Sequence, residues 1–248
     1  MKNHILHEKN EFCFVRELVE WAAEKYGEKT AYSFRPIPTK PETTKISFVK
    51  FRNDVRALST EMLSMGCAGK HCVVIGKFSY EWALTYYAAL CIGAVLVPLD
   101  RDWLAQDLTE TALRADISYL FCDEDIADKA AAIAEKAELY AQPIFMNTKK
   151  EENSLLSLVE NGKEKFARSS EEYFGTQIDP FKMSLLVFTS GTTGKGKGVM
   201  LSQNAILSDL SDVIPRTFLL LSRCNSRLIQ KVDNPFTLGL STFCYEVE

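Results

Sequence analysis

A regular alternation of short apolar runs with longer amphipathic stretches constrains the fold of this chain more than any other feature. The apolar runs have the length of strands and lie at residues 72–75, 94–97, 117–122 and 143–146. The stretches between them have the length of helices and lie at residues 80–91, 104–114 and 125–139. Continuous apolar strands that alternate with helices are typical of a parallel sheet buried on both faces. The sequence therefore predicts an α/β fold, a parallel-rich sheet with helices on both faces.

A smaller group of elements is predicted before this alternation. Residues 12–26 carry apolar side chains at helical spacing, and Gly27 favours a stop after them. Residues 30–34 and 45–48 predict strands, and three prolines make the segment between them an irregular loop. Residues 47–65 predict a long helix. Residues 148–182 are polar, and we predict a connecting segment there with one short helix at 154–159.

The stretch LLVFTSGTTGKGKGVML, residues 185–201, predicts a buried strand, a loop of small residues and a second short strand. Its loop suits a polyphosphate, because glycines allow positive φ, successive N–H groups form anion-binding turns, and hydroxyls and lysines add donors and charge. The candidate phosphate-binding residues are Thr189, Ser190, Gly191, Thr192, Thr193, Gly194, Lys195 and Lys197. A surface turn that is rich in Gly and Thr by chance is the alternative, which the density of these residues disfavours.

The loop also partly matches a Walker A loop, the phosphate-binding loop of many ATPases and kinases. Gly191 to Lys197 fit its first seven positions, but the eighth, a Ser or Thr that ligates Mg²⁺, is Gly198 here. The Walker lysine also opens a helix, whereas residues 199–201 predict a strand. A P-loop ATPase or kinase is therefore an alternative that both departures disfavour.

The run FTSGTTGKGKGV, residues 188–199, resembles the phosphate-loop signature of the AMP-forming adenylating enzymes, which include acyl-CoA synthetases. The chain looks most like bacterial long-chain acyl-CoA synthetases. Two positions depart from the pattern: Gly196 stands where the family usually has Pro or Ser, and Gln203 where it often has His. The run IGAVLVPLD, residues 92–100, resembles a second, structural signature of the family.

This resemblance implies a ligase that activates a fatty or other carboxylic acid with ATP and Mg²⁺, forming an acyl-adenylate and then an acyl-CoA. ATP, Mg²⁺ and coenzyme A are the implied cofactors and co-substrates. The loop would hold the β- and γ-phosphates that leave as pyrophosphate. The chain carries no match to the family's adenine-binding, ribose-binding or Mg²⁺-binding motifs, nor to its C-terminal catalytic lysine.

We therefore expect an N-terminal fragment of the family fold that is inactive alone. Residues 1–215 are assigned to the N-terminal subdomain, with a last helix from Asn204 to about residue 213. Residues 216–248 lose the pattern and are expected to form an aberrant, poorly packed tail. A complementary C-terminal fragment is a candidate partner, and a non-catalytic nucleotide-binding or interaction module is a further alternative.

Charge and hydropathy exclude several other classes of protein. The net charge of −4 disfavours nucleic acid as a partner. The sequence contains no run of about 18 apolar residues, so no transmembrane helix is predicted. The N-terminus lacks the apolar core of a secretory signal. A cytoplasmic protein is expected from the cysteine usage described next.

Cysteine and histidine usage does not predict a catalytic centre. The seven cysteines are irregularly spaced and mostly lie in apolar runs, which indicates reduced, buried thiols. His71 opens a strand-like run and is interpreted as structural. The aromatic residues between Tyr80 and Tyr87 are interpreted as core rather than as a ligand pocket. Asp100, Arg101 and Asp102 are interpreted as a solvated turn.

Overall fold

The computed structural model describes residues 12–35, 42–148, 153–189 and 197–208. The predicted tail at 216–248 lies outside these residues, as does the end of the helix predicted from Asn204. Residues 203–208 are helical, as expected for the start of that helix.

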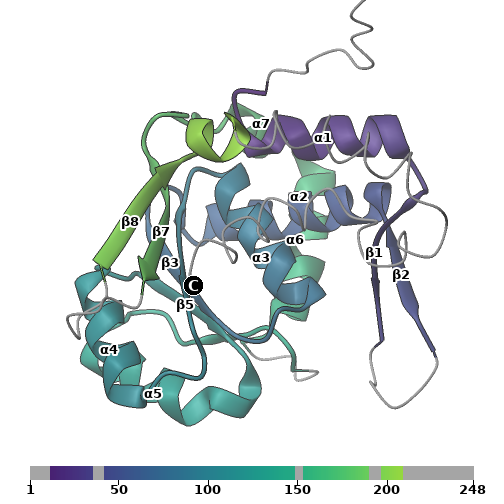
Figure 1. Ribbon diagram of the computed structural model, residues 1–248. Coiled ribbons are helices and arrows are strands. Elements are labelled where there is room, and N and C mark those ends of the chain that lie inside the picture. Colours follow the sequence, from purple (N-terminus) through teal and green to yellow (C-terminus); the bar gives the residue numbers. More distant parts are fainter. Residues whose placement is uncertain (1–11, 36–41, 149–152, 190–196, 209–248) are drawn as a thin grey trace, which may run out of the picture.

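A six-stranded sheet forms the centre of the molecule, with strand order β6-β5-β3-β4-β7-β8 (Figure 1). Its strands are β3 (His71–Ile75), β4 (Val95–Leu99), β5 (Tyr119–Cys122), β6 (Ile144–Phe145), β7 (Met183–Thr189) and β8 (Lys197–Ser202). All neighbouring strands are parallel except β7 and β8. The predicted parallel-rich sheet is confirmed.

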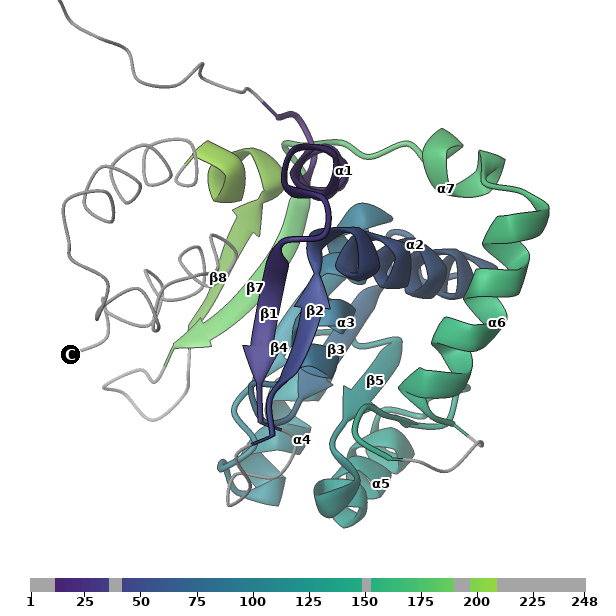
Figure 2. The same ribbon diagram turned by 90° about the vertical axis from the view of Figure 1, so that its right-hand side faces the viewer.

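Helices cover both faces of this sheet. One core joins alternate strand residues such as Cys72 and Val74 to α1 (Val15–Tyr26), α2 (Phe48–Ser64), α3 (Tyr80–Cys91), α6 (Leu155–Arg168) and α7 (Glu171–Gly175). The other core joins Val73 and Ile75 to α4 (Ala105–Arg114) and α5 (Ala127–Lys136). Because successive strand residues point to opposite faces, the two cores lie on opposite sides of the sheet. Figure 2 shows α6 and α7 along the outside of α2.

A short antiparallel hairpin, β1 (Thr30–Phe34) and β2 (Thr44–Ser47), precedes α2. Serine side chains cap three of the helices. Ser47, Ser79 and Ser154 each accept a hydrogen bond from a backbone N–H in the first turn of α2, α3 and α6. Such caps satisfy donors that have no partner inside the helix, and they explain where these helices begin.

The aromatic residues of α3 belong to the core, as predicted. Trp82, Tyr86 and Tyr87 are buried, and Trp82 stacks on Tyr86 with 5.7 Å between ring centroids. Burial raises the pKa of the Tyr86 phenol well above its usual value. These side chains therefore hold α3 against the sheet and the neighbouring helices.

Several predicted elements differ in extent from the observed ones. β4 continues through Pro98 to Leu99 instead of stopping at residue 97, and it can do so because its pairing with β7 is confined to Leu96, before the proline. The helix predicted at 125–139 is a 3₁₀ turn (Glu124–Ile126) followed by α5, which ends at Lys136. The polar connection at 148–182 is largely helical.

The polar segment folds because it carries one narrow apolar stripe. Leu155, Val159 and Gly162 are spaced by four and three residues and are buried, and Leu158 and Phe166 pack partly buried beside them. α6 packs against α2, and its Lys165 ammonium lies 2.7 Å from the Glu61 carboxylate of α2. A stripe of three small or apolar positions is easily missed between charged residues.

Candidate functional site

The predicted phosphate-binding segment begins and ends on an antiparallel hairpin. β7 ends at Thr189, β8 begins at Lys197, and these two residues are paired across the ladder. The structure thus brings together the first and last of the predicted site residues. The other six, Ser190, Gly191, Thr192, Thr193, Gly194 and Lys195, lie outside the described residues.

The conformation after the loop disagrees with a Walker A loop. Lys197 opens a strand and not a helix, as the sequence predicted. Gly198 lies opposite Phe188, and a Cβ added there would come within 3.0 Å of the Leu186 side chain. A Ser or Thr at this position would therefore require a small shift of the Leu186 side chain.

The hairpin is less buried than the sequence predicted. Leu185 and Leu186 are buried, but Val187 and Phe188 are only partly so. On β8, Val199 and Met200 are 43% and 70% exposed. The prediction of a strand buried on both faces was wrong for the outer half of β7, because β8 next to it is the last strand in the described sheet.

The hairpin opens at the carboxyl edge of the parallel sheet. β7 runs parallel to β4, with Leu185 beside Leu96, so the chain leaves both strands at nearly the same level. The segments that follow β3, β4 and β5 leave from the same edge. In open α/β sheets the ligand crevice lies outside the carboxyl ends of the strands. The position of Thr189 and Lys197 fits a binding site.

An ion-pair cluster ties these carboxyl-end segments together. Arg101, which follows β4, donates to Asp123 and to Asp125 after β5, each at 2.8 Å. Asp123 is 1% exposed and also accepts from the backbone N–H of Lys77, at 2.7 Å. A Cβ at Gly76 would come within 2.8 Å of the Asp123 carboxylate. Asp100 and Asp102 are exposed, as a solvated turn predicts, but the interpretation was wrong for Arg101, whose side chain is 19% exposed and paired with Asp123 and Asp125.

Asp125 provides a test of this cluster. Its pKa is held below the usual range, chiefly because its carboxylate accepts a hydrogen bond from Arg101. The depressed pKa means that the pair stabilises the folded chain above the pKa of an unfolded aspartate, and that this contribution is lost as the pH falls through the folded pKa. We expect Arg101→Met to raise the pKa of Asp125 in a carboxyl-carbon NMR titration. An unchanged Asp125 pKa would contradict the pairing.

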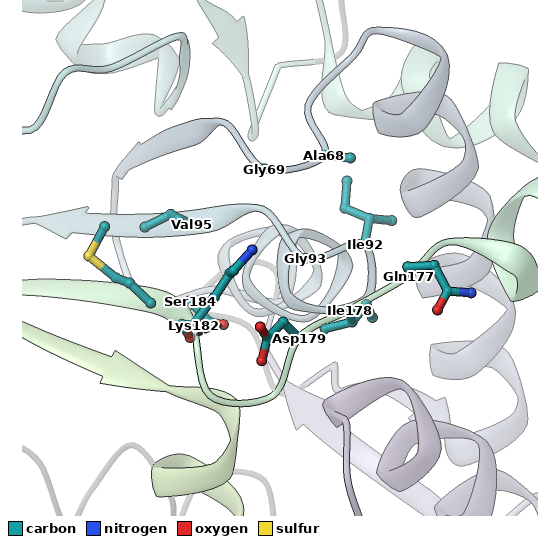
Figure 3. Close-up of a pocket in the computed structure, with 11 residues that line it drawn as sticks. Ala68, Gly69, Ile92, Gly93, Val95, Gln177, Ile178, Asp179, Lys182 and Ser184 are labelled. Carbon is teal, nitrogen blue, oxygen red and sulfur yellow. Dashed lines mark hydrogen bonds between the residues drawn. The ribbon is translucent and has the colours of Figure 1, made fainter.

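A separate hollow of about 630 Å³ lies at the opposite edge, at the amino ends of β3, β4 and β7 (Figure 3). Gly69, Gly93 and Ile178 form part of its wall, and the Lys182 side chain points into it. It contains none of the predicted site residues.

Thiol and metal chemistry find no support in the described residues. Cys67, Cys72, Cys91 and Cys122 are buried free thiols, and burial raises the pKa of Cys91 and Cys122 to about 12. The Nδ1 atom of His71 is hydrogen-bonded to the Ala115 carbonyl, which fits the structural role predicted for this residue. Within the described part of the chain, no three His, Cys, Asp or Glu side chains gather as a metal site requires. No helix described there is long and apolar enough to cross a membrane.

Comparison with known proteins gives one family. The family model described as "AMP-binding enzyme" matches residues 19–245. The match therefore extends past residue 213, up to which the sequence analysis identified motifs of the family. The long-chain-fatty-acid–CoA ligase FadD15 of Mycobacterium tuberculosis is 26% identical over 180 residues, covering 67% of this chain and 28% of the relative. The indoleacetate–CoA ligase of Aromatoleum aromaticum is 29% identical over 196 residues, covering 77% of this chain and 36% of the relative. The chain thus spans about a third or less of the length of these relatives.

Solved structures show the same fold. The crystal structure of a long-chain-fatty-acid–CoA ligase (FadD1) from Archaeoglobus fulgidus superposes with a TM-score of 0.71 and 21% identity, covering 85% of this chain and 40% of that one. The A-PCP didomain of the carboxylic acid reductase from Segniliparus rugosus, in complex with AMP, gives a TM-score of 0.60 at 18% identity, covering 79% and 32%.

Proposed function

This chain belongs to the AMP-binding enzyme family, and we propose that it is the phosphate-binding part of an ATP-dependent, AMP-forming carboxylate–CoA ligase. The substrate would be a fatty or other carboxylic acid, activated as an acyl-adenylate before transfer to coenzyme A. The observation that carries the proposal is the hairpin pairing of Thr189 with Lys197 at the carboxyl edge of the sheet. The relatives whose names describe acid–CoA ligases support the reaction class.

The chemical task is in-line attack of a carboxylate on the α-phosphorus, with pyrophosphate as the leaving group. Positioning and charge neutralisation lower such a barrier. In the proposal, backbone N–H groups and hydroxyls from Thr189 to Thr193 bind the β- and γ-phosphates, and Lys195 and Lys197 neutralise them. Mg²⁺ would enter with the substrate as MgATP and add to the charge neutralisation at the phosphates.

We infer that turnover needs parts outside these 248 residues, on a longer polypeptide or on a complementary fragment. The relatives are about three times as long as their matched segments. The exposed Val199 and Met200 on β8 support this edge as the docking place for such a part. The buried free thiols fit a reducing compartment, and we place the protein in the cytoplasm on that ground.

Nucleotide titration and ATP–pyrophosphate exchange test the function. We expect residues 1–248 to bind MgATP weakly and to catalyse no exchange with a panel of fatty acids, because phosphate contacts alone replace contacts with water. Lys197→Ala should weaken MgATP binding about fivefold, as expected for the loss of one charge-assisted contact at an exposed position. Lys163→Ala, on the exposed surface of α6, is the matched control and should leave binding unchanged.

Two results would count against the proposal. Exchange clearly above a no-enzyme control would show that the parts outside these residues are dispensable. Binding that Lys197→Ala leaves unchanged would remove the role assigned to the hairpin and favour a non-catalytic interaction module. The P-loop ATPase or kinase is not favoured, because Lys197 opens a strand.

A further inference from the structure

Arg101 is connected through described contacts to the residue just before the predicted phosphate loop. Its guanidinium bridges Asp123 and Asp125, and four residues later the chain enters α4. At the far end of α4, the guanidinium of Arg114 lies 5.5 Å from the ring centroid of Phe188. Phe188 directly precedes Thr189. A chain of contacts therefore connects the buried Asp123 carboxylate, through Arg101 and α4, to Phe188 near the end of β7.

The segment between Arg101 and α4 is fixed from a second side. The Lys129 ammonium of α5 donates to the backbone carbonyls of Arg101 and Trp103, at 3.0 and 2.9 Å. Trp103 itself packs against the core between α4, α5 and the sheet. The guanidinium and the backbone carbonyl of Arg101 are thus each held by hydrogen bonds, so the start of α4 has little freedom to shift.

We propose that Arg101 is a positioning residue for phosphate binding, which sets the place of α4 and, through Arg114 and Phe188, the place where β7 releases the chain at Thr189. The inference rests on the proposed function, since it concerns the same phosphate-binding edge. Arg101 acts through other residues, because its guanidinium faces Asp123 and Asp125 on the β5 side of β4, away from β7.

A purely stabilising role is the competing explanation, and the chain offers a matched control for it. Arg56 of α2 makes a two-pronged ion pair with Glu20 of α1, on the other face of the sheet. Its side chain is 22% exposed, against 19% for Arg101. Removing either arginine takes the main ion-pair partner from a partly or fully buried carboxylate, which destabilises the fold. Only the Arg101 pair lies on a path to Phe188.

The experiment measures MgATP affinity of the full 248-residue chain by following the ³¹P resonances of ATP during titration, with melting temperatures recorded in parallel. Arg101→Met and Arg56→Met should both lower the melting temperature. Arg101→Met should raise the dissociation constant about tenfold, since small displacements of a binding group have large effects. Arg56→Met should leave the dissociation constant unchanged. Arg101→Lys, which keeps one ion pair but not the fork, should lie between wild type and Arg101→Met.

Arg114→Leu is the independent variant, because it breaks the path at Phe188 without touching Asp123. It should weaken MgATP binding severalfold with little change in melting temperature. If Arg101→Met does not fold, Arg101→Lys and Arg114→Leu decide, and wild-type affinity in both overturns the inference. Folded Arg101→Met with wild-type affinity overturns it directly. A wild-type chain that shows no ³¹P shift removes the proposed function, and this inference falls with it before any variant is compared.

Discussion

Replacing Gly162 by alanine should destabilise the chain by about 3 kcal/mol or prevent folding, the upper range for overpacking of a tight contact. α6 crosses α2 so closely that a Cβ at Gly162 would lie 1.9 Å from the carbonyl oxygen of Ala57. Backbone forms this contact, so no side-chain rotation relieves it. Alanine gains only about 1 kcal/mol over glycine in helix propensity, which is too little to offset the clash.

Gly175→Ala is the matched control for Gly162→Ala. Gly175 is the last residue of α7, and a Cβ there would meet nothing within 4 Å. Its free energy of unfolding, measured by urea denaturation, should stay within about 1 kcal/mol of the wild type. Equal stability of the two variants would mean that α6 does not cross α2 at Gly162.

Local sequence patterns predicted the elements in which nearly every residue is apolar and buried. α3 was predicted with the observed bounds, because its residues from Trp82 to Cys91 are almost all apolar. The sheet was predicted because β3, β4 and β5 are continuous apolar runs, which only a sheet covered on both faces accommodates. The two strands around the loop were predicted from their apolar runs, whereas the pairing of Thr189 with Lys197 is a finding of the structure.

Features that depend on distant partners could not be predicted from the sequence. Arg101 lies in a polar turn, and nothing local shows that Asp123, 22 residues later, is buried beneath it. One signal was available, since Asp100 and Asp123 each follow directly after an apolar strand run. The helix predicted at 154–159 was too short because Gly162 disfavours a helix locally, while the contact with α2 stabilises one.

Gln203, where the resembling family often has histidine, is expected to be among the most sensitive positions of the fold. It is 0% exposed and lies directly after the end of β8, beside the amino end of β7, where it joins this segment to α1 and α3. Its Oε1 accepts from the backbone N–H of Val15 at 2.9 Å, and its Nε2 donates to the carbonyl of Leu90 at 2.7 Å. Val15 opens α1, so its N–H has no partner within that helix.

Gln203→Leu should therefore lower the free energy of unfolding by about 3 kcal/mol, because each buried backbone group left unpaired costs about 1–3 kcal/mol. Gln203→His should retain part of this, since a neutral imidazole offers one donor and one acceptor. Urea denaturation measures both variants, and hydrogen exchange of the Val15 amide reports the broken bond directly. Gln203→Leu with wild-type stability and an unchanged Val15 exchange rate would show that α1 is anchored by its apolar face alone, through Leu18, Val19 and Ala22.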